Sequence, residues 1–237
     1  MTALLYKDLG VLDYNAALAV QENLVEQKHK ADLPDILLLV EHPHVITLGR
    51  GGKESNVVDA AEVAVIRSSR GGDVTYHGPG QLVAYPIVDL KSKLRKDVHR
   101  YLRWLEATAI RTLADFGIAA ERRPPCTGIW IGKKKIAAIG VAVRRGITYH
   151  GLALNVSTDL SYFRRIVPCG LAWSEVTSIE QELGKSVSMN EVKTIFLRRF
   201  ARRFGYAAVK EVCHDDIPTG SRLRLPAAPI TSGSSGF

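Results

Sequence analysis

The first half of the chain alternates between short apolar runs and one long stretch with helical spacing. Apolar runs at residues 4–9, 36–40 and 45–48 predict strands, and the second run has no polar position, which is typical of a strand buried on both faces. Between the first two runs, helical spacing covers residues 14–30, directly after Asp13, a residue type that caps helices well. Two further strands are expected at residues 63–66 and 82–88.

Helical spacing returns in the second half, on either side of a group of strands. Asp97 precedes helical spacing over residues 98–116, and Ser188 with Glu191 forms a capping box ahead of another long helix. Between these helices, apolar runs are separated by turns of lysine, arginine and glycine, which predicts an antiparallel meander. The runs lie at 128–131, 135–143 and 147–156, a short helix is expected at 177–183, and the last helix has the apolar stripe Val192, Phe196, Phe200 and Phe204.

These elements predict one domain of the mixed α/β (α+β) class. The chain has 237 residues, and residues 1–206 contain no internal repeat and no linker rich in proline, glycine or serine. We expect one folded domain over residues 1–209, of a size typical of catalytic domains. Residues 210–237 lose the hydrophobic periodicity, so we expect a polar and partly disordered tail there.

Composition and charge narrow the classes of function. Hydrophobic residues make up 46% of the chain and charged residues 24%, as in folded soluble proteins. The sequence shows no run of 18 apolar residues, no leader pattern and only widely spaced cysteines, so we expect a cytoplasmic protein with no membrane partner. The net charge of +8 favours an acidic partner. No nucleic-acid-binding motif accompanies this charge, so nucleic acid is not the expected partner.

Two motif-like stretches do not qualify as phosphate or metal sites. Gly128 and Gly132-Lys133 resemble a phosphate-binding loop, but they have three residues between the glycines where that loop needs four. His42 and His44 are metal-ligand types, but no second pair with metal-site spacing occurs in the sequence. We therefore expect no metal site.

The stretch from Arg70 to Gln81 is the most unusual in the chain. Four glycines and a proline in twelve residues predict a loop, and glycine is used where the backbone must approach another group closely. Thr75, Tyr76 and His77 add polar and aromatic side chains, which is typical of a binding loop. On composition alone, a tight connection with a structural histidine stays as open as a functional loop.

Cys169 and Lys135 are the two single residues that stand out from their surroundings. Cys169 lies between proline and glycine in a predicted loop, where a thiol is accessible. Cys126 and Cys213 fit the commoner role of inert cysteines, and residue statistics alone favour that role for Cys169 as well. Lys135 begins an apolar strand, where a lysine is less expected and is able to tune a neighbouring group.

Four stretches in order, residues 70–85, 135–140, 150–155 and 168–170, resemble the motifs of the lipoyl(octanoyl) transferase family. The resemblance covers roughly residues 4–205. It implies a fold similar to the catalytic module of biotin and lipoate ligases, with one larger mixed sheet, a smaller sheet and flanking helices. It also implies octanoyl transfer from octanoyl-acyl carrier protein to a lysine of a lipoyl domain, through a cysteine thioester and with no cofactor.

The same resemblance implies roles for individual residues. Cys169 and Lys135 would be catalytic. The implied partners are octanoyl-acyl carrier protein, the lipoyl domains of 2-oxoacid dehydrogenases and the glycine cleavage H protein, and we expect a monomer. The implied substrate-binding residues are Arg70, Gly71, Gly72, Asp73, Val74, Thr75, Tyr76, His77, Ala138, Ile139, Gly140, His150, Gly151 and Leu152.

Elementary chemistry agrees with this assignment. A free thiol has a pKa near ~8.5, so little of it is thiolate at pH 7, and a nearby ammonium such as that of Lys135 would favour the reactive anion. Lys135 is also a candidate for moving the proton of the accepting amine. Two alternatives stay open: an ATP-dependent lipoate-protein ligase on the same fold, and a non-catalytic adaptor that binds the carrier.

Overall fold

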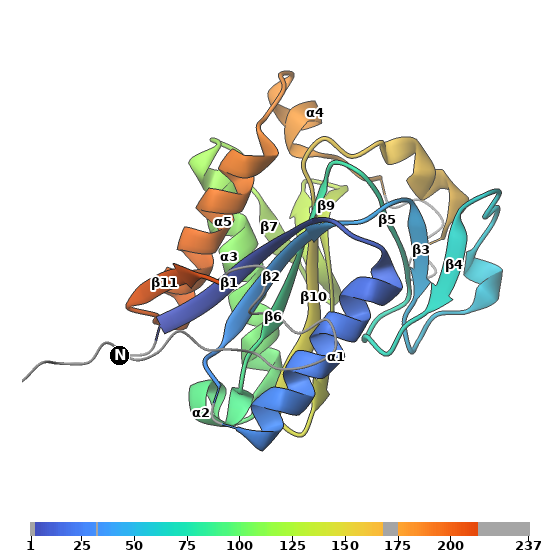
Figure 1. The fold of residues 1–237 in the computed structure, drawn as a ribbon. Helices are drawn as coiled ribbons and strands as arrows, with labels where there is room; N and C mark the ends of the chain where they lie inside the picture. The colour runs from blue at the N-terminus through green and yellow to red at the C-terminus, as the bar shows by residue number, and fades with distance from the viewer. Residues whose placement is uncertain (1–2, 32, 168–174, 213–237) are drawn as a thin grey trace, which may run out of the picture.

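Eight strands form the main sheet of the computed structural model, which describes residues 3–31, 33–167 and 175–212 (Figure 1). Their order across the sheet is β11-β1-β2-β6-β10-β9-β8-β7. The pairs β11–β1 and β1–β2 are parallel, and all the other neighbours are antiparallel. The strands are β1 (Ala3–Val11), β2 (Ile36–Glu41), β6 (Gln81–Ile87), β7 (Glu121–Arg123), β8 (Cys126–Ile131), β9 (Lys134–Arg144), β10 (Ile147–Asn155) and β11 (Ala208–Glu211).

Helices cover both faces of this sheet (Figure 1). Helix α1 (Tyr14–Lys30) lies on one face, and α3 (Val98–Asp115) and α5 (Met189–Phe204) pack together on the other. The carboxylate of Asp13 accepts hydrogen bonds from the first backbone N–H groups of α1, as the sequence predicted. The remaining helices are α2 (Leu90–Leu94), α4 (Ile179–Leu183) and the 3₁₀ helices η1 (Glu54–Asn56) and η2 (Leu160–Arg165).

The uninterrupted apolar run of β2 is explained by burial on two sides. Leu37 and Leu39 face the core beneath α3 and α5, whereas Leu38 and Val40 face the core beneath α1. Because successive side chains of a strand point to opposite faces, a strand between two helical layers has no solvent-facing position to fill with a polar residue. Each fully buried leucine contributes about 1.5–3 kcal/mol of transfer free energy.

A second sheet of three strands lies beside the main one, in the order β4-β3-β5. It consists of β3 (Val45–Leu48), β4 (Ala64–Arg67) and β5 (Val74–His77). The prediction that residues 70–81 form only a loop is wrong, because β5 lies within them. Its four residues are β-branched or aromatic, which favours a strand, but the glycines on both sides concealed that signal.

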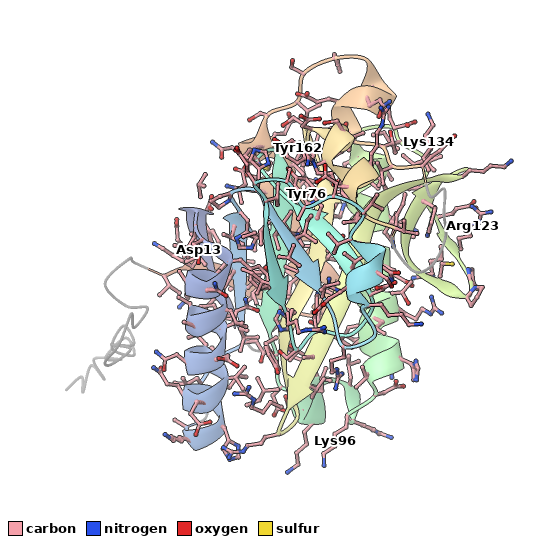
Figure 2. The ribbon with its side chains drawn as sticks, turned by 90° about the vertical axis from the view of Figure 1, so that its right-hand side faces the viewer. Asp13, Tyr76, Lys96, Arg123, Lys134 and Tyr162 are labelled. Atoms are coloured by element: carbon pink, nitrogen blue, oxygen red, sulfur yellow. The ribbon has the colours of Figure 1, made fainter. Side chains whose placement is uncertain are left out.

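Tyr76 anchors the core of this small sheet (Figure 2). Its ring stacks on Tyr162 of η2 with centroids 5.0 Å apart, and its hydroxyl forms a 2.7 Å hydrogen bond with Nδ1 of His44. The small sheet is therefore tied to η2 by an aromatic stack, while its other face remains available to the main sheet.

The expected helices and strands are all present, with ends within two residues of the predicted ones. One local detail was wrong: the Ser188 side chain makes no capping hydrogen bond at the start of α5. The apolar stripe of that helix, from Val192 to Phe204, is buried as predicted. The sequence analysis also missed α2 and the edge strands β7 and β11, which are short and lack clear periodicity.

The sheet continues slightly beyond the expected boundary at residue 209. Lys210 and Glu211 belong to β11 and pair with β1, and the N–H of Val212 donates to the carbonyl of Tyr6 at 3.0 Å. Among the described residues, no helix has the length and apolar character needed to cross a membrane.

Candidate active site

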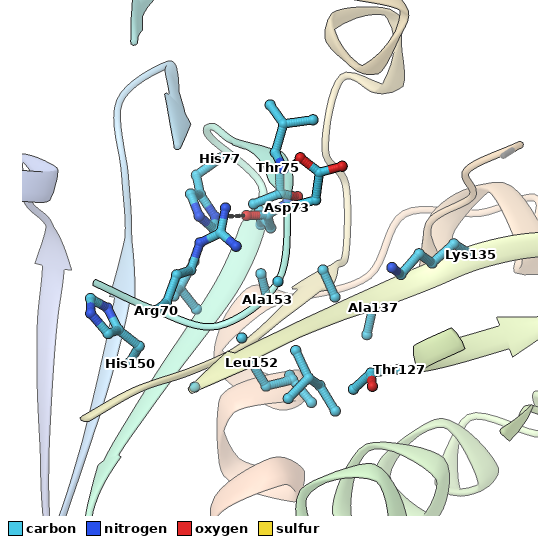
Figure 3. A pocket seen from close by; sticks show the side chains of 18 of the residues that line it. Arg70, Asp73, Thr75, His77, Thr127, Lys135, Ala137, His150, Leu152 and Ala153 are labelled. Carbon is cyan, nitrogen blue, oxygen red and sulfur yellow. Dashed lines mark hydrogen bonds between the residues drawn. The ribbon is translucent and has the colours of Figure 1, made fainter. Parts of the chain in front are cut away.

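A cavity of about 360 Å³ lies between strands β9 and β10 of the main sheet and the segment 70–81 (Figure 3). All but three of the site residues expected from the sequence line it. Strand β9 supplies Lys135 and residues 137–140, and β10 supplies residues 150–153 and Asn155. The segment supplies Arg70, Gly72, Asp73, Val74, Thr75, His77 and Gln81, and the remaining lining residues are Tyr14, Val83, Tyr85, Pro125, Cys126, Thr127, Phe163 and Val176.

The three exceptions have different positions. Gly71 does not line the cavity, and its N–H donates to the carbonyl of Val141 on β9 at 2.8 Å. Tyr76 lies on the opposite side of β5, in the core of the small sheet. Cys169, with its neighbours Pro168 and Gly170, lies outside the described residues.

Gly140 allows the segment 70–81 to rest directly on β9, and Gly151 allows β10 to lie close to β6. Gly140 and Gly151 are directly opposite each other on β9 and β10. A Cβ on Gly140 would lie 2.8 Å from the carbonyl oxygen of Gly71, and a Cβ on Gly151 would collide with the carbonyl of Ala84. The motif glycines therefore act here through close backbone approach, which larger residues would prevent.

The cavity is long and has two different ends (Figure 3). Lys135 and Thr127 lie at one end, and Arg70, His77 and His150 lie at the other. Lys135 and Gly140 are five residues apart on β9, or about 16 Å at ~3.3 Å per residue. Between the ends the wall is apolar and small, with Ala137, Ala138, Ile139, Leu152 and Ala153.

The Lys135 end is held through the backbone of β9. The N–H of Lys135 donates to the carbonyl of Glu175 at 2.8 Å, and the N–H of Thr177 donates to the carbonyl of Lys135 at 3.0 Å. The ammonium lies 5.5 Å from the centre of the Trp130 ring. Gly128 makes room for the stem, since a Cβ there would lie 2.7 Å from Lys135 Cε.

The opposite end contains a buried guanidinium. Arg70 is 7% exposed, and its Nη2 donates to the carbonyl and to Oγ1 of Thr47 at 2.7 and 2.8 Å. Its Nη1 donates to the carbonyl of Gly71 at 3.1 Å. Burial, the neighbouring His42 and the Arg70 charge lower the pKa of His77 to about 3. Burial and the Arg70 charge likewise lower the pKa of His150 to about 3. Both imidazoles are therefore neutral at physiological pH.

His150 also has an uncommon backbone conformation. Its φ is +56°, a left-handed value that is rare outside glycine. The strand is held in this shape by a buried hydrogen bond of 2.7 Å from the His150 N–H to Oε1 of Gln21, and Nε2 of the ring contacts Oγ of Ser69 at 3.0 Å. Such conformations occur at sites where the surrounding structure over-determines them.

The sequence analysis missed several lining residues. Tyr14 and Tyr85 reach the cavity from α1 and β6. Tyr85 ends the quoted motif at residues 70–85, whereas nothing in a single sequence marks Tyr14 as a neighbour of Lys135. Burial raises the pKa of both hydroxyls, so they stay neutral. Gln81 and Asn155 were within the quoted motifs, so the motif boundaries carried a signal that the residue assignments did not use.

The arrangement suits a linear apolar group with a reactive head. Small apolar side chains line the middle of the cavity, and an amine lies at the end that the Lys135 side chain occupies. Among the residues that the structure describes, no group of three or more His, Cys, Asp or Glu is suited to a metal ion. An apolar lining with an amine at one end is compatible with chemistry on an acyl group.

Comparison with known protein families gives a match over most of the chain. The model of the lipoyl protein ligase A/B catalytic domain matches residues 13–201. A relative from Solibacter usitatus named octanoyltransferase is 52% identical over 206 residues, which cover 84% of this chain and 92% of that protein.

Solved structures show the same fold at low identity. A lipoate-protein ligase A structure with bound ATP superposes with a TM-score of 0.73 at 19% identity, over 90% of each chain. The biotin protein ligase from Aquifex aeolicus superposes with a TM-score of 0.51 at 14% identity, over 86% of this chain and 70% of that one. The predicted likeness to the catalytic module of lipoate and biotin ligases is confirmed, with a larger and a smaller sheet flanked by helices.

Proposed function

The chain belongs to the lipoyl protein ligase A/B catalytic-domain family and catalyses octanoyl transfer in lipoate biosynthesis, and we propose that the octanoyl group passes through a thioester on Cys169. The donor in this proposal is octanoyl-acyl carrier protein, and the acceptor is a lysine of a lipoyl domain. The observation that carries the proposal is the long apolar cavity with Lys135 at one end.

The dimensions of the cavity support an eight-carbon acyl group. An extended octanoyl chain is about 8–9 Å long at ~1.2 Å per bond, so it fits within the roughly 16 Å between Lys135 and Gly140. With its carbonyl at the Lys135 end, its methyl end reaches Ala138 on β9. Burial of seven alkyl carbons provides at most about 6 kcal/mol, at ~0.8 kcal/mol per carbon.

In the first step the Cys169 thiolate attacks the thioester carbonyl of the donor. A bond forms between Sγ and the carbonyl carbon, the bond to the carrier sulfur breaks, and the carrier leaves as a thiolate that takes up a proton. The role proposed for the Lys135 ammonium is to favour the Cys169 thiolate over the thiol before attack.

In the second step the acceptor amine attacks the Cys169 thioester. A bond forms between the amine nitrogen and the carbonyl carbon, the bond to Sγ breaks, and the nitrogen loses a proton as the amide forms. Lys135 is the group proposed to exchange that proton, because its amine lies at the reactive end of the cavity.

Arg123 supports the approach of an acidic carrier to this end of the cavity. It pairs directly with Cys126, which lines the cavity, and its exposed guanidinium lies 5.5 Å from the centre of the Trp130 ring. Figure 2 shows Arg123 and Lys134 extending outward on the same side of the molecule. A cation at the rim would attract an acidic protein or the phosphate of its acyl-bearing arm.

Intact mass spectrometry tests the proposed thioester. Incubation with octanoyl-acyl carrier protein and no nucleotide should add one octanoyl group to the wild type and none at this position to Cys169→Ser. Subsequent addition of a lipoyl domain should remove the group from the wild type and place it on the domain. Full transfer by Cys169→Ala would refute the thioester route, and a strict requirement for ATP would favour the ligase alternative.

A further inference from the structure

One line of hydrogen bonds runs along the cavity wall and joins its two ends. Each donor in the line points in the same direction, from the guanidinium end toward the amine end. The line consists, in order, of Arg70, Thr47, His77, Gln81, Asn155, Thr177 and Lys135.

The main chain fixes the direction of this line at its Lys135 end. The carbonyl of Thr177 only accepts, so the side-chain amide of Asn155 must present Nδ2 to it, at 3.0 Å. Oδ1 of Asn155 then accepts from Nε2 of Gln81 at 2.9 Å. Nε2 of Gln81 also donates to the carbonyl of Tyr76 at 3.2 Å, which gives the same amide orientation independently.

This orientation determines the protonation of His77. Oε1 of Gln81 faces Nδ1 of His77 at 2.7 Å, so Nδ1 must carry the proton. Nε2 is then the acceptor, and it faces the hydroxyl of Thr47 at 3.4 Å. That hydroxyl oxygen already accepts two hydrogen bonds from Arg70, so its own proton is free to point to His77.

The same line ends on the backbone that holds Lys135. Nδ2 of Asn155 donates to the carbonyl of Thr177, and the N–H of Thr177 donates to the carbonyl of Lys135 at 3.0 Å. Thr177 is eight positions after Cys169 in the sequence. The Asn155 side chain therefore connects β10, through Thr177, to the first residues of β9.

We propose that Gln81 and Asn155 are positioning residues that hold the Lys135 end of β9 in register with the His77 segment and fix His77 as its Nδ1–H tautomer. Neither amide needs to touch the acyl group to have this effect. The consequence for catalysis rests on the proposed octanoyl transfer, whereas the tautomer and the amide orientations do not.

The titration of His77 tests the geometry without any substrate. The groups that face its ring are Arg70, Thr47, Gln81, His42, Tyr14 and His150. In ¹⁵N-edited NMR spectra of the free protein, assigned with His77→Asn, we expect the Nδ1–H tautomer and no protonation between pH 8 and pH 5. Gln81→Glu places a carboxylate against Nδ1, so the imidazole should then titrate within this range. An Nε2–H tautomer, or no change in Gln81→Glu, would overturn the assignment.

Kinetics of Asn155→Asp test the positioning role. The aspartate is nearly isosteric and still accepts from Gln81, but it has no N–H for the carbonyl of Thr177. We expect kcat to fall at least tenfold while the KM for octanoyl-acyl carrier protein changes less than twofold.

Thr148→Val is the matched control on the same strand. Oγ1 of Thr148 is buried and bonds the N–H of Val88 and the carbonyl of Pro86, away from the cavity. The Thr148→Val variant should have a lower melting temperature than the wild type, but its kcat should stay within twofold of the wild-type value. Equal kcat losses in both variants at equal melting temperatures, or unchanged kcat in Asn155→Asp, would refute the positioning role. If the wild type transfers no octanoyl group, the proposed function is wrong. The NMR titration then still tests the His77 tautomer and the direction of the hydrogen bonds, because it needs no substrate.

Discussion

The two ends of the cavity both contain basic side chains, but their surroundings make them opposite in chemistry. At one end Lys135 lies over the Trp130 ring at the start of a strand, next to the exposed hairpin that bears Arg123. At the other end Arg70 is buried and bonded to carbonyl and hydroxyl oxygens, with His77 and His150 beside it. The first environment keeps a side-chain amine at the cavity, which is the group that we propose takes part in acyl transfer. At the second end, burial and the Arg70 charge keep the two imidazoles neutral.

The difference shows that residue type alone does not identify a reactive group. Histidine is the usual acid–base catalyst at neutral pH, yet His77 and His150, with pKa values of about 3, have too little basicity for that role. Burial is the largest cause in both cases. We expect the histidine end to shape and close the cavity, and the lysine end to carry the chemistry.

Removal of the Lys135 amine should have the largest effect. Lys135→Met keeps most of the stem but loses the charge and the exchangeable proton, so we expect kcat to fall about a thousandfold, within the range for acid–base groups. Because the ammonium favours the thiolate, its loss should move the pH–rate curve for iodoacetamide alkylation of Cys169 to higher pH. Lys133→Met, in the exposed turn just before β9, should match the wild type in both measurements. An unchanged alkylation curve in Lys135→Met would show that Lys135 does not favour the Cys169 thiolate.

The neutral histidines predict a loss of stability in mild acid. Their pKa values are about 3 in the folded protein and near 6.5 in an unfolded chain, so the unfolded state binds more protons below about pH 6.5. Stability is therefore full above that pH and falls as pH decreases. For the two groups together we expect a loss of about 3 kcal/mol between pH 7.5 and 5.5.

Urea unfolding at several pH values measures this loss. His77→Asn should remove about half of it, whereas replacement of the exposed His29 by Asn should leave it unchanged. Equal pH dependence in wild type and His77→Asn would show that His77 is not a neutral buried group, and would remove the main contrast between the two ends.

The sequence predicted residues at both ends of the cavity, since Lys135 at one end and Arg70, His77 and His150 at the other line it as expected. Lys135 is conspicuous because it begins an apolar strand, and helical and strand periodicity placed β9 and β10 within two residues of their true ends. Nothing local shows that Tyr14 and Tyr85, 71 positions apart, meet at one cavity, because that contact depends on the packing of α1 over the sheet. We expected Tyr76 to bind substrate because it lies in the motif. Side chains alternate between the two faces of β5, however, and the Tyr76 side chain lies in the core of the small sheet. Motif membership therefore predicts the location of a segment, and strand geometry decides which side chains face the cavity.

Ala138 tests whether the space between the two ends sets acyl length. It lies three residues from Lys135 on β9, about 10 Å at ~3.3 Å per residue, where the methyl end of an octanoyl group would lie. Ala138→Leu should lower octanoyl transfer about tenfold and leave hexanoyl transfer within twofold of wild type. Val143→Leu adds volume at an exposed position of the same strand and should change neither rate. Equal losses for both chain lengths would place the acyl group elsewhere in the cavity.

The smallest expected effect concerns the outer side of the Lys135 end, where Arg123 lies opposite Cys126. Arg123→Ala should raise the KM for octanoyl-acyl carrier protein about three- to fivefold at low salt, because an exposed cation contributes little beyond long-range attraction. The difference from wild type should shrink at high ionic strength, as screening weakens that attraction. With the small, uncharged donor octanoyl-N-acetylcysteamine the two proteins should have the same KM. Arg145→Ala, an exposed arginine at the far turn of β9, should leave both KM values unchanged. If Arg123→Ala raises the KM for the small donor as much as for the carrier, then Arg123 shapes the cavity rim and does not receive the carrier.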